Sequence, residues 1–428
     1  MIPDVNNLNY YYFNKESNLL YDKDKYKINF FVVFKQFFEI FVKGIGALKY
    51  FFDLGYYGFC TQSDFALFGF TNNNIRSLSP LKEHLPSSNI FSDHNIKFKK
   101  VWFYAMLYSP VILYRCLVYK SYKKETYCFN FKGFCRSYGM YKEASKMLKI
   151  INPKFVIVSN YQSYTSRSFY KAAKELGIKT VFLQHATAVE CDPQLDFDYA
   201  FLDGIEAYEK LTARKKSLSK IFLSGNPRFD FFPVISNVKE DFILGIAINI
   251  LDDEKFVKNF ILECKNEIPE LQIVLRPHPT TNLQYWKKKC EDWGCLFSNS
   301  STENPFEFIT RCSFFIAGDS SFHLDVAIAD KLSFYYNFTS QKSLDLYSYI
   351  KNNLIIDISY DAFKYLKTIK KEDEKYKNSR TKYYVANYET QFWQKSAYLI
   401  AKTLIKIDRE EDFCNFWCKK ENFYVIKK

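Results

Sequence analysis

The chain has 428 residues, of which 48% are hydrophobic, so it is long enough for two or three globular domains. Its formal net charge of +13 suits an anionic partner: nucleic acid, an anionic membrane surface or a phosphorylated substrate. The lysines are spread along the chain and no run resembles a basic nucleic-acid arm, so we expect no nucleic acid among the partners.

The N-terminal stretch "MIPDVNNLNYYYFNKE" lacks the basic start and the continuous apolar core of a signal peptide, so we expect a cytoplasmic protein. Charged residues interrupt the apolar segment 28–52, and the apolar segment 101–114 is shorter than the roughly 20 residues that a spanning helix needs. We therefore expect neither segment to span a membrane. Peripheral contact with the inner face of the cytoplasmic membrane stays open, because a Lys-bearing aromatic helix can lie at an interface, although such stripes more often belong to a core.

Residues 1–150 are rich in aromatic side chains and predict helices with a pair of strands, without an internal repeat. After residue 153 the pattern becomes regular. Short apolar runs bounded by turn residues predict strands at 154–160, 179–185, 198–204 and 220–230. Helical periodicity predicts helices between them at 164–177 and 205–216. This is the pattern of repeated βαβ units.

A second series of the same kind follows the polar, Pro-containing segment 231–241. Strands are predicted at 242–249, 271–279, 295–298, 313–318 and 332–338. Helices are predicted at 252–266, 281–294, 304–311 and 320–330, and the charged tail becomes amphipathic at 388–407.

This order predicts an α/β protein with two doubly wound Rossmann-like domains that face a cleft. We expect an N-terminal domain at 1–235, a second domain at 236–370 and a helical tail at 371–428 that packs back across both. In open α/β sheets ligands bind at the carboxyl ends of the strands. The residues just after each strand are therefore the candidates for a site.

In the second series, the stretch "IVLRPHPTT" ends a strand at Arg276 and His278. The flanking prolines, Pro277 and Pro279, fix the backbone and end the strand because proline donates no ladder hydrogen bond. The planar donors of Arg276 suit phosphate oxygens. A structural histidine in a tight turn is the competing interpretation.

The stretch "FFIAGDSSFHLDVAIAD" runs from a strand into a helix whose expected N-cap is Asp319 or Ser320. The hydroxyls of Ser320 and Ser321, with the first amides of the helix, suit a phosphate-bearing ligand, although Ser-Ser is also simply a good cap. His323 and Asp325 follow in the first turn. Asp325 suits either a ribose hydroxyl or the capping of the helix.

In the first series, a strand ends at His185, and Glu190 follows closely. We expect His185, His278 and His323 to face the cleft. The turn "LSGNPRFD" places Gly225 after another strand, where glycine permits close approach of the backbone to a ligand. Arg228 in this turn suits either phosphate or an ion pair with Asp230.

Together, "QHA", "GNPRFD", "RPHP" and "GDSSFHLDVAIADKLSFYYN" resemble motifs of bacterial GT-B glycosyltransferases that build capsules, teichoic acids and lipopolysaccharide. The chain is most similar to the CDP-glycerol glycerophosphotransferase type and to capsule Kdo and sialic acid transferases with HP and Ser-Ser motifs. The resemblance covers about residues 154–337. It implies a transferase that moves a sugar or polyol phosphate from a nucleotide-activated donor to an oligosaccharide or lipid-linked acceptor.

The resemblance also implies a mechanism without a metal or other cofactor. His185 would accept the proton of the acceptor hydroxyl, with Glu190 as the reserve base. The leaving nucleotide would be held by donor-side residues at the strand ends, namely Arg276, His278, Ser320, Ser321, Asp325, Gly225 and Arg228. The acidic pair in "LDDEK" (251–255) opens a helix, where aspartate is expected as a cap.

Two other functions compete with this interpretation. A nucleotide-sugar 2-epimerase has the same two-domain architecture but needs several carboxylates around the sugar. A basic protein that binds nucleic acid or membrane, with an inactive transferase fold, is the alternative from a different class.

Overall fold

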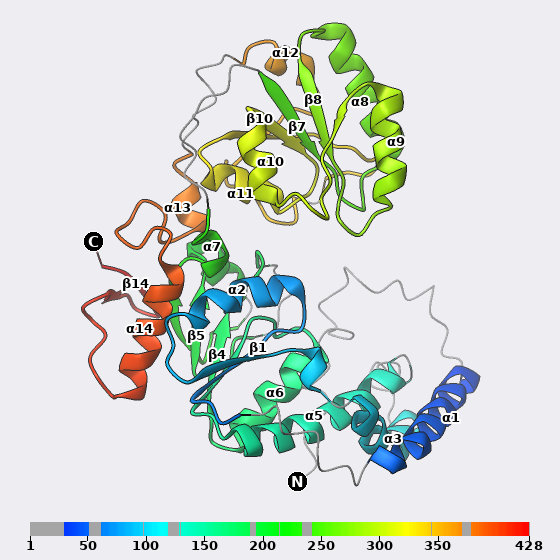
Figure 1. Ribbon diagram of the computed structural model, residues 1–428, viewed down its shortest axis with the longest axis vertical. Helices are drawn as coiled ribbons and strands as arrows, with labels where there is room; N and C mark the ends of the chain where they lie inside the picture. Colours follow the sequence, from blue (N-terminus) through cyan, green and yellow to red (C-terminus); the bar gives the residue numbers. More distant parts are fainter. Residues whose placement is uncertain are drawn as a thin grey trace. The chain divides into compact units, whose positions relative to one another are not determined.

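The computed structural model describes residues 30–50, 61–96, 98–118, 128, 130–188, 194–213, 215–232, 242–343, 345–369 and 378–427 (Figure 1). The chain divides into two compact units. The first comprises Met1–Asp203, Ala207–Asp230 and Lys395–Lys428, and the second comprises Gly204–Glu206 and Phe231–Gln394. The chain therefore returns to the first unit after completing the second.

The sheet of the first unit has eight strands in the order β13-β14-β6-β5-β4-β3-β1-β2. Among the strand pairs that the structure describes in this sheet, only β13–β14 is antiparallel. The strands are β1 (Phe65–Phe68), β2 (Ser88–Phe91), β3 (Phe155–Val158), β4 (Lys179–Leu183), β5 (Tyr199–Leu202), β6 (Lys220–Leu223), β13 (Trp417–Lys419) and β14 (Phe423–Ile426). Strands β1 and β3 are buried along their whole length, as expected for a parallel sheet covered on both faces.

The helices of the first unit begin at polar caps where the sequence provides them. Thr71 and Ser163 accept hydrogen bonds from the backbone at the starts of α2 and α6. The helices are α1 (Phe30–Ala47), α2 (Asn72–Lys82), α3 (Phe98–Val118), α5 (Phe131–Ile151), α6 (Tyr164–Glu175), α7 (Ile205–Thr212), which starts at the unit boundary, and α14 (Ser396–Asp408). Helices α1, α3 and α5 pack around a separate apolar cluster.

The second unit has a six-stranded parallel sheet in the order β12-β11-β10-β7-β8-β9. Its strands are β7 (Ile243–Ala247), β8 (Gln272–Arg276), β9 (Leu296–Phe297), β10 (Phe314–Ala317), β11 (Leu332–Tyr335) and β12 (Ile356–Asp357). Its helices are α8 (Glu254–Glu267), α9 (Leu283–Trp293), α10 (Pro305–Arg311), α11 (Phe322–Ile328), α12 (Ala362–Leu366) and α13 (Thr381–Tyr384). Two buried clusters form its core.

Strand order reverses once in each parallel series. In the first unit the chain runs from β1 outward to β2 and then, on the other side, through β3, β4, β5 and β6. In the second it runs from β7 to β8 and β9, and then through β10, β11 and β12 on the other side. The reversals lie between β1 and β3 and between β7 and β10, which is where ligands bind in doubly wound sheets.

The strands and helices predicted between residues 154 and 338 are confirmed, and so are the two Rossmann-like domains. The strand pair expected in the N-terminal third is β1 with β2, and β1 pairs with β3 inside the first sheet. Both predicted domain boundaries, at 235 and 371, fall outside the described residues. The unit border lies nearby, between Asp230 and Phe231, and the tail divides between the units.

The apolar segment 101–114 was expected to be too short for a spanning helix. It lies within helix α3, which has 21 residues, so the expected length is wrong. Among the described residues one helical segment, Lys99–Val118, is long and apolar enough to cross a membrane by length and composition. Within this segment 39% of the assessed window is buried inside the protein.

Candidate functional site

The carboxyl edge of the first sheet is held by a buried polar network. Asn226 follows β6, and its side-chain amide donates to the Gln184 carbonyl at 2.8 Å and to Asp203 Oδ1 at 3.0 Å. The Asp203 backbone N–H donates to Gln184 Oε1 at 2.9 Å. All three residues are buried. Satisfied buried networks are rigid, so the loops after β4, β5 and β6 are fixed with respect to one another.

His185 follows this network at the end of β4 and is half-buried. The pKa of His185 is lowered to about 4, mainly by burial and in smaller part by the positive charge of Arg228. A hydrogen bond with the Ser159 backbone, after the neighbouring β3, acts in the opposite direction. His185 is therefore neutral at pH 7 and able to accept a proton. Its predicted place at a strand end is confirmed, and its role as a base stays a prediction.

Three other first-domain candidates have different outcomes. Gly225 is buried and has a φ of +72°, a conformation that favours glycine. The Arg228 backbone N–H donates to Asn226 Oδ1 at 3.0 Å, and its guanidinium carbon lies 4.3 Å from the centre of the Phe229 ring. The carboxylate of Asp230 accepts from two backbone N–H groups at the start of α14, at 2.7 and 2.8 Å. Glu190 lies outside the described residues.

The second sheet brings together loops after β7 and β10, at the reversal of strand order. Asn249 donates from its side-chain amide to the Asp319 carbonyl at 3.1 Å. Its backbone N–H donates to Asp252 Oδ2 at 2.7 Å. A Cβ atom on Gly318 would lie 2.7 Å from Asp252 Oδ1, so only glycine fits there without rearrangement. The two loops are therefore closely packed and joined by hydrogen bonds.

Asp252 is a residue that the sequence interpretation missed. Asp253 is the N-cap of α8, as expected for this acidic pair, but Asp252 lies against the loop after β10. Burial, and to a lesser extent the nearby charge of Asp319, raises its pKa to about 6. The sequence does show a second aspartate, Asp252, directly before the cap Asp253. Because an acidic pair at a helix start is common, the pattern does not separate a capping residue from one that contacts another loop.

The Ser-Ser pair begins α11, but the predicted cap is wrong by one residue. Ser321 is the N-cap, and its hydroxyl makes no capping hydrogen bond. Ser320 Oγ accepts from the Phe322 backbone N–H at 3.3 Å. Both serines are half-buried, as is Asp325 in the first turn. Helix α11 has only seven residues, so its dipole is short. We therefore expect an anion here to be bound mainly by the hydroxyls of Ser320 and Ser321.

His278 is exposed after β8, as predicted. Its Nδ1 lies 2.8 Å from Thr280 Oγ1 and accepts from the Thr280 backbone N–H at 3.3 Å. Partial burial lowers its pKa, so the ring is neutral at pH 7. Because Nδ1 is an acceptor, the ring proton lies on Nε2, which can donate a hydrogen bond to a ligand.

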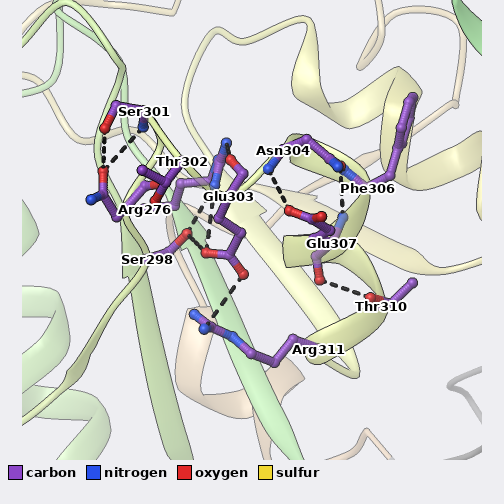
Figure 2. A network of polar contacts seen from close by, with 11 residues as sticks. Arg276, Ser298, Ser301, Thr302, Glu303, Asn304, Phe306, Glu307, Thr310 and Arg311 are labelled. Carbon is purple, nitrogen blue, oxygen red and sulfur yellow. Dashed lines mark hydrogen bonds and ion pairs between the residues drawn. The ribbon is translucent and has the colours of Figure 1, made fainter.

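Arg276, which was predicted to bind phosphate, is buried and only 8% exposed. Its guanidinium donates to Ser298 Oγ at 2.9 Å and to the Glu303 carbonyl at 2.8 Å (Figure 2). Its Nη1 also lies 3.7 Å from Glu303 Oε2, and Arg311 pairs with the other carboxylate oxygen of Glu303 at 3.4 Å. Arg276 thus holds the 298–303 loop, and direct contact with a phosphate stays a prediction.

The expectation that His323 faces a cleft is wrong, because it is 1% exposed. Its Nε2 donates to the Gly318 carbonyl at 3.0 Å, and its Nδ1 lies 2.6 Å from Ser333 Oγ. Burial lowers its pKa to about 4, so the ring is neutral. Its function is to fix the glycine that precedes the Ser-Ser pair.

No group of three or more His, Cys, Asp or Glu in the described part of the chain could hold a metal ion. At the described strand ends, His185 and His278 are neutral imidazoles, and Ser320 and Ser321 carry hydroxyls. An imidazole can accept a proton, and a hydroxyl or a ring N–H can donate to a phosphate oxygen.

No protein-family model and no curated protein matches the sequence. The fold is similar to that of a UDP-N-acetylglucosamine 2-epimerase, with a TM-score of 0.53 at 13% identity, over 86% of this chain and 100% of the other. A Listeria monocytogenes protein assigned to the same enzymes gives 0.53 at 11% identity, over 82% and 98% of the two chains. The wall teichoic acid polymerase TagF gives 0.46 at 13% identity, over 90% and 99%. At such identities the epimerase matches establish the fold alone.

Proposed function

We propose that the protein is a metal-independent glycosyltransferase that moves a sugar or polyol phosphate from a nucleotide-activated donor to a growing surface polysaccharide, of capsule or lipopolysaccharide. The observation that carries this proposal is the second domain's strand edge. There His278 presents an Nε2–H to solvent, and the Ser-Ser pair follows β10 at the reversal of strand order. The motif resemblance supplies the reaction class.

The second domain would bind the leaving nucleotide. His278 Nε2–H and the hydroxyls of Ser320 and Ser321 would donate to the phosphate oxygens, where negative charge grows as the bond to the transferred group breaks. Arg276 would act by fixing the neighbouring loop. Asp325 would take a ribose hydroxyl. These groups would do the work of the divalent ion that many transferases use.

The first domain would activate the acceptor. His185 is neutral at pH 7, so its ring can take the proton of an acceptor hydroxyl as that oxygen attacks. The buried Asn226 network fixes the backbone on which His185 lies. Gly225 and Arg228 in the adjoining turn would contact the ligand on the side of this domain, and Glu190 remains the reserve base.

The epimerase interpretation is the alternative, because two structures assigned to that activity share the fold, with a TM-score of 0.53. An epimerase acts on the nucleotide sugar alone. A transferase releases free nucleotide only when the sugar has an acceptor, water included. Incubation with CDP-, CMP-, UDP- and GDP-activated donors, with and without an oligosaccharide acceptor, therefore separates the two when released nucleotide is read by mass spectrometry and the epimer, which has the same mass as the donor, is read by proton NMR. Epimerised nucleotide sugar without release would overturn the transferase proposal.

Replacement of His278 by alanine is expected to weaken binding of the active donor by roughly 10- to 100-fold, the value of one hydrogen bond to a charged group. The melting temperature should stay within about 1 °C, because an exposed side chain contributes little. Isothermal titration calorimetry measures the donor affinity of wild type and variant, and thermal melting measures their stability. His84→Ala, which removes an exposed histidine from the first domain, is the control, and equal weakening there would remove His278 from the donor site.

Replacement of both Ser320 and Ser321 by alanine is expected to lower donor affinity by more than tenfold, because two hydroxyl donors are lost. Stability should fall by at most about 1 kcal/mol, since Ser321 Oγ makes no capping bond and Ser320 Oγ makes one long contact. Donor titration and thermal melting of the same preparation measure the two effects. Unchanged affinity with a lowered melting temperature would show that the pair only caps α11.

We also propose that the reaction takes place in the cytoplasm, on an oligosaccharide or lipid-linked acceptor at the inner face of the cytoplasmic membrane. Nucleotide-activated donors suit the cytoplasm, and the described cysteines, which are free thiols, suit its reducing conditions. The part of the protein that would contact the membrane is inferred below.

A further inference from the structure

Helix α1 has two apolar stripes rather than one. Val33, Ile40, Gly44 and Ala47 form a buried stripe that faces the cluster shared with α3 and α5. A second stripe is exposed to solvent and follows the helical spacing of three or four residues. It consists of Phe31, Phe34, Phe38, Phe41, Val42 and Ile45, and Leu48 extends it past the helix end. Within it Phe31 is 75%, Phe38 62% and Val42 69% exposed.

Helix α3, which packs against α1, repeats this arrangement. Ala105, Tyr108, Ile112 and Cys116 are buried in the shared cluster. On another side, Leu107, Tyr114, Leu117 and Val118 are exposed at helical spacing, and Tyr114 is 64% exposed. A core helix needs one apolar side, so the second side of each helix is unexplained by the fold. Contiguous exposed apolar surface of this kind marks an interaction site.

The charges on these helices are almost all positive. In residues 30–50 and 98–118 the acidic residue is Glu39, against the basic residues Lys35, Lys43, Lys49, Lys99 and Arg115, while Lys100 is buried. Glu39 accepts from Lys43 and Lys132 at 2.6 Å, and these bonds lower its pKa to about 2. The negative charge is therefore already paired, and the outward charge of the helix pair is positive.

Lysines of these helices also contact aromatic rings. Lys99 Nζ donates to Tyr50 Oη at 2.8 Å and lies 3.9 Å from the centre of its ring. Lys43 Nζ lies 4.7 Å from the centre of the Trp102 ring. Amphipathic aromatic rings beside lysines are typical of the boundary between lipid chains and headgroups, where the lysine stem is apolar and its head contacts phosphate.

We propose that the exposed stripes of α1 and α3 dock on the surface of an anionic lipid bilayer. Lipid is the occupant that matches both features, an apolar surface and a positive charge. A second copy would bring the same positive charges to the interface, where like charges repel. Because the buried sides of both helices remain in the protein core, the contact is interfacial and does not span the bilayer. This docking rests on the proposed function for its purpose, which is to bring the enzyme to a lipid-linked acceptor.

Co-sedimentation of the full chain with vesicles tests the surface without any donor. The protein is expected to bind vesicles of equal parts phosphatidylglycerol and phosphatidylcholine and to remain in solution with phosphatidylcholine alone. Raising the ionic strength from about 0.15 M to about 1 M should weaken binding several-fold, because the Debye length falls from about 8 to about 3 Å. The combined variant Phe38→Gln, Val42→Gln and Ile45→Gln should lose binding roughly tenfold or more.

The matched control removes three exposed apolar side chains elsewhere, by Leu218→Gln, Leu296→Gln and Tyr360→Gln, and should bind as the wild type does. Circular dichroism and nucleotide release with a soluble oligosaccharide acceptor should be unchanged in the α1 variant, so loss of docking and loss of enzymatic function can be told apart. If the wild-type protein does not co-sediment with anionic vesicles, the proposal is overturned. A wild-type dimer that the α1 variant converts to monomer would instead assign the surface to a second copy.

Discussion

Replacement of His185 by alanine is expected to reduce the rate of transfer by about 10²–10⁴-fold while donor binding stays close to that of the wild type. The range is that of general base catalysis by a positioned side chain. Donor binding should survive because the proposed phosphate contacts of His278, Ser320 and Ser321 belong to the second domain. Nucleotide titration and a steady-state assay on the same preparations separate the two effects.

The pH dependence of the wild type should report the same residue. Burial lowers the pKa of His185 from 6.5 to about 4. The active, neutral form therefore persists on acidification, and kcat/KM for the base should stay level from pH 7 to about pH 5 and fall only below that. A profile that instead falls through pH 6.5 would mean a solvated histidine, or a different base.

His84→Ala provides the matched control, because it removes an exposed histidine of the same domain, whose ring lies edge-on to that of Tyr398 in α14. It should leave both transfer and donor binding unchanged. If His185→Ala turns over normally, the role of base passes to Glu190. If it loses only donor affinity, His185 belongs with the phosphate contacts.

The fold could be predicted from the sequence because its elements depend on local patterns. Buried parallel strands such as "FVIV" and "FFIA" are continuous apolar runs, and Ser159 after the first and Gly318 after the second mark the strand ends. Helix starts could be predicted as well where a strong cap precedes the helix, as Ser163 and Asn304 do. The aromatic N-terminal third was not, because Phe and Tyr suit a strand, a helix core and an exposed stripe alike.

The candidate site was predictable in its positions and less so in its contacts. Sequence shows that a residue ends a strand, but it does not show where a long side chain points. His278 faces solvent as expected, whereas His323 points back to the Gly318 carbonyl. Asp252 acquires its importance from a glycine 66 positions later in the chain. Such long-range contacts leave no local pattern for the sequence to reveal.

Replacement of Arg276 by alanine is expected to destabilise the second domain by about 3 kcal/mol, at the lower end of the cost of breaking a buried ion pair. Glu303 would keep only Arg311 as an ionic partner, and Ser298 Oγ and the Glu303 carbonyl would each lose a donor. For a domain of this size the loss corresponds to a fall in melting temperature of roughly 6–12 °C. Differential scanning calorimetry measures it directly.

Two further variants decide whether Arg276 acts through this loop or on a phosphate. Arg311→Ala removes the more exposed partner of Glu303, so it should cost less stability than Arg276→Ala. Arg276→Lys keeps the charge but loses the planar fork that reaches Ser298 and Glu303 together, so it should recover little of the melting temperature. If Arg276 acts by holding the 298–303 loop, Arg276→Ala should bind donor only modestly less tightly than the wild type, at a temperature where the variant is folded. A variant that melts as the wild type does but has lost donor binding would place the guanidinium on the phosphate, because a group that is needed for the loop cannot be removed without a cost in stability.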